Sequence, residues 1–108
     1  MRITDKTLND VTAEAVRADE KHGSNSMYYR YATDDRRLTI LTEEVGEVAR
    51  EINEKTLDRN RVDYKVNLRS ELVQVAAMAV TWIQALDDYK NLCEKCGHEK
   101  ASFYIRMK

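Results

Sequence analysis

Two short blocks of the sequence place oxygen-bearing side chains beside apolar residues. The stretch EEVGE sets Glu44 and Glu47 three residues apart, and the stretch ELVQ sets Glu71 and Gln74 at the same spacing. Residues three or four apart share one face of a helix, so each block presents a pair of oxygen ligands on one side. Carboxylate and amide oxygens are the ligands that suit Mg²⁺ and Mn²⁺.

Each block also has a plainer interpretation when taken alone. Acidic residues along a helix flank are usually a solvated face. Glu71 lies near the start of a predicted helix, where it would favour the positive end of the helix dipole. The two blocks together favour metal binding, because antiparallel packing of their helices would bring three carboxylates and one amide oxygen to one place.

The elements that must carry these blocks are predicted to be helices. The chain has 108 residues, no proline and only three glycines, which favours a single all-α domain. We predict helices near residues 5–22, 34–55 and 67–92. Residues 1–92 would form a helical bundle, with residues 93–108 as a C-terminal tail.

Local signals mark where these helices begin and end. Thr4 or Asp5 is the predicted N-cap of the first helix, and Gly23 follows its last turn. Thr33 is placed to cap the second helix. The third is predicted to begin at Asn67, after a polar connection without periodicity.

Apolar periodicity indicates how the helices pack. On the second helix the apolar positions alternate spacings of three and four, which makes one continuous stripe: Leu38, Leu41, Val45, Val48 and Ile52. The middle of the third, LVQVAAMAVTWIQAL, is apolar almost all round, which is typical of a helix buried on most sides. Two other helices cannot cover it, so we expect a homodimer or a larger assembly.

Composition and charge narrow the classes of partner. The formal net charge of −1 gives no basic footprint, so we expect no polymeric nucleic acid as a partner. Residues 72–86 are interrupted by polar side chains and are too short for a membrane span. The first ten residues lack an apolar signal region, so the expected compartment is the cytosol.

The two acidic blocks resemble the E-E-x-x-E … E-x-x-D signature of the MazG-like all-α nucleotide pyrophosphohydrolases. The resemblance covers about residues 8–88 and is closest to the short single-domain type of bacteria and phages. It implies a helical bundle that forms a dimer or a dimer of dimers. It also implies Mg²⁺-dependent hydrolysis of a nucleoside or deoxynucleoside triphosphate to the monophosphate and pyrophosphate. Glu44, Glu47 and Glu71 match the metal-binding carboxylates, and Glu44 or Glu47 would orient the attacking water.

The sequence departs from this signature at Gln74, where the family has aspartate. An amide oxygen can coordinate a hard cation but brings no charge, so the site would bind metal less strongly. Two hypotheses follow. The first is a metal-dependent hydrolase, and the second is a catalytically weak or inactive module that binds a nucleotide or a partner protein.

A polyphosphate substrate also requires cations, because the chain has no glycine-rich phosphate-binding loop. Lys21 and His22, at the end of the first helix, and Arg50 are candidates for binding substrate, as are Arg37 and Lys55. Each of them is otherwise an ordinary surface residue.

The tail contains a possible zinc motif in the stretch CEKCGHEK. Cys93, Cys96 and His98 offer at most three ligands, whereas structural zinc takes four, so a second chain would have to complete the site. Two reduced cysteines in a cytosolic protein are the interpretation that we favour over Zn²⁺.

Overall fold

The computed structural model describes residues 1–53 and 62–90, and these form an all-α structure, as predicted. In chain order the elements are α1 (Asp5–His22), the 3₁₀ turn η1 (Gly23–Asn25), α2 (Asp34–Asn53) and α3 (Val62–Asp88). The predicted end of α2 at residue 55 lies outside the described residues, whereas α3 ends at Asp88, before the predicted end at 92. The predicted tail with Cys93, Cys96 and His98 also lies outside the described residues.

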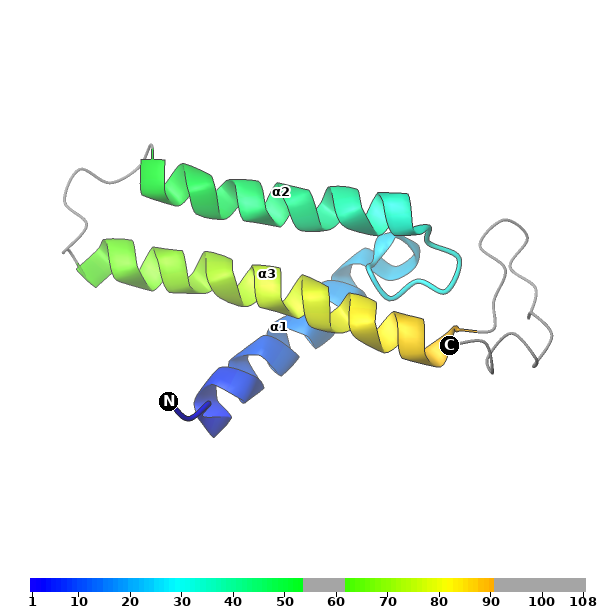
Figure 1. The fold of residues 1–108 in the computed structure, drawn as a ribbon, viewed down its shortest axis with the longest axis horizontal. Helices are drawn as coiled ribbons and strands as arrows, with labels where there is room; N and C mark the ends of the chain where they lie inside the picture. The colour runs from blue at the N-terminus through cyan, green and yellow to red at the C-terminus, as the bar shows by residue number, and fades with distance from the viewer. Residues whose placement is uncertain (54–61, 91–108) are drawn as a thin grey trace.

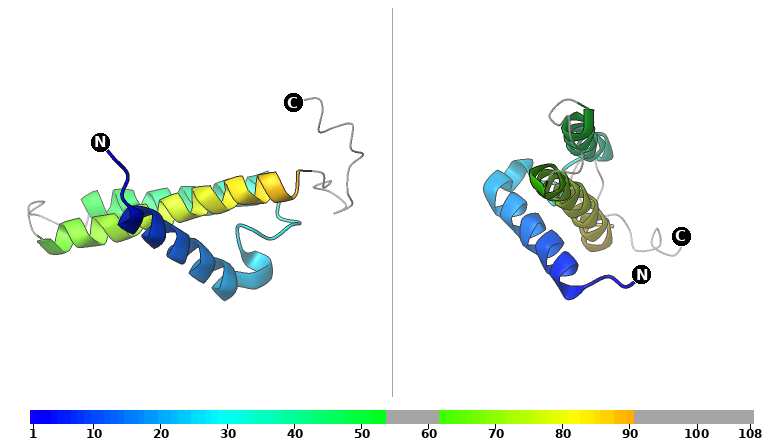
Figure 2. Two further views of the ribbon diagram at one scale, coloured as in Figure 1. Left: turned by 90° about the horizontal axis from the view of Figure 1, so that it is seen from below. Right: turned by 90° about the vertical axis from the view of Figure 1, so that its left-hand side faces the viewer.

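The helix α3 is the centre of the arrangement. Figure 1 shows α2 and α3 side by side and antiparallel, and α3 also packs against α1. The views in Figures 1 and 2 agree that α1 crosses this pair obliquely instead of running along it. Both α1 and α2 thus pack against α3, and residues 23–33 connect them (Figure 1).

The predicted helix caps of α1 and α2 are confirmed. The Oγ1 of Thr4 accepts a hydrogen bond from the Thr7 N–H at 3.3 Å. Gly23 has φ 52°, a left-handed conformation that favours glycine, and its N–H donates to the carbonyl of Asp19. The Oγ1 of Thr33 accepts from the Arg36 N–H at 3.2 Å. These ends are fixed by side chains within one turn, which explains why the sequence predicts them well.

The predicted start of α3 at Asn67 is wrong, because the helix already begins at Val62. An asparagine within a helix costs only a fraction of a kcal/mol, so it does not stop the helix. Tyr64 is buried, with 8% of its surface exposed, and burial of an aromatic ring favours the additional turn. The polar residues around Tyr64 conceal this contribution in the sequence.

A small core lies where α1 crosses α3. Its buried members are Ala18, Met27, Ala77 and Met78, and Ile40, Leu41 and Trp82 are among the partly buried residues packed against it. Alanines at the crossing allow the helices to approach closely, and methionine side chains fill the remaining space. This core fixes the position of α1 over α3, and therefore the shape of the space between α1 and α2.

The connection between α1 and α2 is held by side chains from the first turn of α2 and the last turn of α3. Arg37 is buried and donates to the carbonyls of Met27, at 2.9 Å, and Tyr29, at 3.0 Å. The Tyr28 hydroxyl donates to Asp88 of α3 at 2.5 Å. Arg37, a candidate for phosphate binding in the sequence, therefore serves to hold the connection.

Both α2 and α3 expose apolar side chains. Leu38 and Val45 on α2 are about half exposed, and so are Leu72, Ile83 and Leu86 on α3. The single chain thus leaves uncovered part of the apolar surface that the sequence predicts to be buried. None of the helices within residues 1–53 and 62–90 is long and apolar enough to cross a membrane.

Candidate metal and phosphate site

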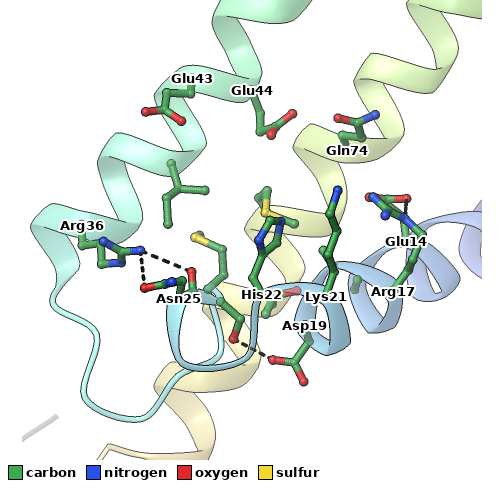
Figure 3. A pocket seen from close by; sticks show the side chains of 17 residues that line it. Glu14, Arg17, Asp19, Lys21, His22, Asn25, Arg36, Glu43, Glu44 and Gln74 are labelled. Atoms are coloured by element: carbon green, nitrogen blue, oxygen red, sulfur yellow. Dashed lines mark hydrogen bonds and ion pairs between the residues drawn. The ribbon is translucent and has the colours of Figure 1, made fainter.

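A cavity of about 520 Å³ occupies the space between α1, α2 and α3. Its floor is apolar and includes Ile40, Met27 and Met78, and its walls carry charged and polar side chains from all three helices. Figure 3 shows Glu43 and Glu44 entering from α2, and Gln74 from α3. Lys21 and His22 rise from α1 toward the carboxylate of Glu44 and the amide of Gln74 (Figure 3).

Glu44 carries a carboxylate oxygen that is buried in an unfavourable environment. Its Oε2 atom is buried and has no hydrogen-bond partner among the described residues. Burial raises the pKa of Glu44, and four neighbouring carboxylates raise it further: Glu71, Glu47, Glu14 and Glu43. Buried carboxylate oxygens in folded proteins are normally hydrogen-bonded, so an unpaired one facing other carboxylates fits a position that a cation occupies.

The four predicted metal ligands are brought to the same region, though not to identical positions. Glu44 and Gln74 line the cavity, whereas Glu47 and Glu71 do not line it but act on the pKa of Glu44. Glu47 is half exposed, and its Oε2 lies 4.0 Å from Arg50. Within residues 1–53 and 62–90, no three acidic, histidine or cysteine side chains are already gathered as a metal-binding group.

Glu14 of α1 is a carboxylate that the sequence analysis missed. It lines the cavity from the wall opposite Glu44. Arg17 donates to both of its oxygens, at 2.9 and 2.6 Å, and these hydrogen bonds lower the pKa of Glu14. A signal was present, since Glu14 lies beside the apolar residues Val11 and Ala15 just as Glu44 lies beside an apolar stripe.

The basic side of the cavity also differs in part from the prediction. Lys21 and His22 line the cavity, as does Arg36, which the sequence analysis did not consider. Arg36 donates to the carbonyl and side-chain oxygens of Asn25 at 3.4 and 3.3 Å, which are long for such bonds. Among the described residues, neither Lys21 nor Arg36 is in an ion pair. Arg50 lies near Glu47, away from the cavity lining, and residue 55 is not described.

On the α2 side, the cavity is therefore lined by basic Arg36 toward one end and by acidic Glu43 and Glu44 toward the other. Arg36 and Glu44 are eight residues apart on α2, which is about two helix turns. Lys21 and His22 of α1 add a cation and a titratable imidazole opposite them. A divalent cation bound to phosphate groups complements such a surface, because the metal satisfies the carboxylates and the phosphates satisfy the cations.

Comparisons of the chain with protein-family models, with curated proteins and with solved structures found no match. The resemblance to the MazG-like family therefore stays a prediction, and it rests on the blocks EEVGE and ELVQ. The function has to be inferred from the chemistry of the cavity.

Proposed function

We propose that this chain is a cytosolic, metal-dependent nucleoside triphosphate pyrophosphohydrolase. It would cleave a nucleoside or deoxynucleoside triphosphate to the monophosphate and pyrophosphate. The observation that carries the proposal is the buried Oε2 of Glu44, which has no hydrogen-bond partner within residues 1–53 and 62–90. Glu44 lines a cavity that Lys21 and Arg36 also line. Leaving such an oxygen unpaired costs free energy, which a bound divalent cation would recover.

The residues near Glu44 fit a hard cation such as Mg²⁺ or Mn²⁺. Glu44, Glu47 and Glu71 supply negative charge, and Gln74 supplies a neutral oxygen. The bound cation would polarise phosphoryl oxygens and lower the pKa of a water molecule. Glu44 and Glu47, three residues apart on α2, are the groups that would orient this water and accept its proton.

The phosphate groups would be held by side chains instead of a glycine-rich loop. Lys21 and Arg36 supply cationic side chains, and Arg36 can direct two N–H groups at one phosphate. His22 adds a donor beside them, and all three line the cavity. Arg36 can leave Asn25 at little cost, because its present hydrogen bonds are long.

One assay separates this proposal from the non-catalytic alternative. Purified protein is incubated with Mg²⁺ and each of the common ribonucleoside and deoxyribonucleoside triphosphates, and pyrophosphate release is measured. We expect release that requires Mg²⁺ and produces the monophosphate in equal amount. Nucleotide binding without any turnover would reject the hydrolase and support the module that only binds.

We also propose that a second copy of the chain covers the exposed apolar side of α2 and α3, giving a homodimer or a dimer of dimers. Leu72, Ile83 and Leu86 share one side of α3, since they are spaced by whole helix turns, and all are about half exposed. Soluble monomers rarely leave such a stripe uncovered. Light scattering at micromolar concentration should report a mass of at least two chains, and a compact monomer would reject this assembly.

A further inference from the structure

A second cavity, of about 550 Å³, is lined by residues of α1 and α3. Lys6, Asp10 and Arg69 are among the residues that line it. The two cavities share three lining residues: Glu14, Arg17 and Gln74. These three side chains therefore form the partition between the cavities, with Glu14 and Arg17 on α1 and Gln74 on α3 (Figure 3).

The partition thus contains both the charged Glu14 and the neutral Gln74. Gln74 offers the site an oxygen without charge, and the neighbouring Glu14 carboxylate is only 18% exposed. Glu14 is also close enough to Glu44 for its charge to raise the pKa of that residue. The buried Oε2 of Glu44, which no described residue hydrogen-bonds, also indicates that a cation binds here.

The present partner of Glu14 can be exchanged. Arg17 is 57% exposed and pairs with Glu14 across one turn of the same helix. Exposed pairs of this kind add little to stability, so breaking one is inexpensive compared with gaining a divalent cation. Arg17 could then bind a phosphate group, since a guanidinium binds phosphate with the same paired geometry that it uses for a carboxylate.

We propose that Glu14 is a metal-binding carboxylate of this site, supplied by α1 where α3 provides only the amide of Gln74. When a divalent cation binds beside Glu44, Glu14 turns from Arg17 to the cation. Arg17 is thereby released to bind phosphate groups of the substrate. This inference rests on the proposed function, because it requires that a divalent cation binds next to Glu44.

The test measures metal binding directly, without turnover. The dissociation constant for Mn²⁺ is obtained from the electron paramagnetic resonance signal of free Mn²⁺. We expect Glu14→Gln to weaken Mn²⁺ binding roughly 10- to 100-fold, the range observed when a supporting group of a metal site is lost. The matched control is Asp10→Asn, one turn earlier on α1, because Asp10 lines the second cavity alone. Its Mn²⁺ affinity should equal that of the wild type.

Two more variants test the exchange of partners. Arg17→Gln removes the competitor for Glu14 and should tighten Mn²⁺ binding about two- to fivefold. The same variant should raise the KM for a triphosphate roughly tenfold, because one charge-assisted contact to phosphate is lost. In the double variant Glu14→Gln/Gln74→Asp the charge count is restored, so Mn²⁺ affinity should return toward the wild-type value.

The outcomes separate this inference from the function on which it rests. Equal Mn²⁺ affinity in Glu14→Gln and the wild type, with binding lost in Glu44→Gln, would reject the role of Glu14 and leave the metal site standing. A wild-type protein that binds no Mn²⁺ would overturn both. Circular dichroism and thermal melts of each variant establish that it is folded. A purely structural Glu14 would lower the melting temperature without changing Mn²⁺ affinity, which would also reject the inference.

Discussion

The two cavities beside the α1–α3 crossing hold carboxylates in opposite electrostatic conditions. In the second cavity, Asp10 lies 2.8 Å from both Lys6 and Arg69, and hydrogen bonds from these two residues lower its pKa. In the first cavity, Glu44 has a buried oxygen that lacks a partner in the described part of the chain, and burial and neighbouring carboxylates raise its pKa. Asp10 is satisfied within the chain and helps to join α1 to α3. The buried oxygen of Glu44 has no such partner among the described residues. This is the difference expected between a structural and a ligand-binding carboxylate.

The contrast begins in the sequence of each helix. Asp10 has Lys6 four residues before it, so one counter-ion is available on its own helix face. The residues three and four positions from Glu44 are all apolar or acidic: Ile40, Leu41, Glu47 and Val48. The helix therefore offers Glu44 no cation within a turn, and the packing of α3 and α1 brings more carboxylates instead.

The largest expected effect comes from exchanging each carboxylate for its amide. Glu44→Gln should reduce pyrophosphate release about 100-fold or more, because it removes a negative ligand of the catalytic cation. It should also raise the free energy of unfolding without Mg²⁺ by about 1 kcal/mol, since a buried unpaired charge is removed. Steady-state assays and denaturant titrations measure the two effects. Turnover that survives the exchange would remove Glu44 from the site.

The dependence on pH should distinguish the two carboxylates next. Metal binds the ionised form of Glu44, whose pKa is raised above its ordinary value of 4.5. Mn²⁺ affinity should therefore begin to fall while the pH is still above 4.5, and approach a loss of about tenfold per pH unit below the pKa of Glu44. Binding titrations over a pH series test this, and an affinity that stays constant until the pH is well below 4.5 would contradict it.

Without metal, Glu44 and Asp10 should change the free energy of unfolding in opposite directions over the same pH series. The raised pKa of Glu44 means that its ionised form opposes folding, and this opposition is lost as the pH falls through that pKa. The lowered pKa of Asp10 means that its stabilising contribution is present above 3.8 and is lost as the pH falls through its folded-state pKa. Stability should therefore first rise and then fall on acidification. The initial rise should be smaller in Glu44→Gln.

A smaller effect is expected when a charge is added to the first cavity. Gln74→Asp should tighten Mg²⁺ binding about tenfold, because another carboxylate faces the cation. Without metal it should lower the melting temperature, and Mg²⁺ should restore it by binding only the native state. Thermal melts of both proteins with and without Mg²⁺ make the comparison. Destabilisation that Mg²⁺ does not reverse would show that Gln74 packs as a neutral amide, and would favour the non-catalytic module.

The smallest effect should come from the satisfied carboxylate. Asp10→Asn leaves the contacts of Lys6 and Arg69 weaker, so the melting temperature should fall by only a few degrees at most. Pyrophosphate release should not change, because Asp10 lies outside the lining of the first cavity. A large loss of turnover in this variant would end the distinction between the two cavities.

The sequence by itself determined the features that depend on neighbours along the chain. The caps at Thr4, Gly23 and Thr33 follow from side chains within a turn, so the limits of α1 and the start of α2 were predictable. Glu44 stood out for the same reason, since its position beside an apolar stripe is visible in the helical period.

Only the tertiary structure decided which side chains from different helices share a cavity. Glu14 and Glu44 line the same cavity because α1 crosses α3 at the core that contains Ala18 and Ala77, and no local pattern encodes that crossing. Arg36 lines the cavity while Arg37 is buried against the connection, although the two are adjacent in sequence. Adjacent residues on a helix point about 100° apart, so the packing of the connection determines which arginine is left for a ligand.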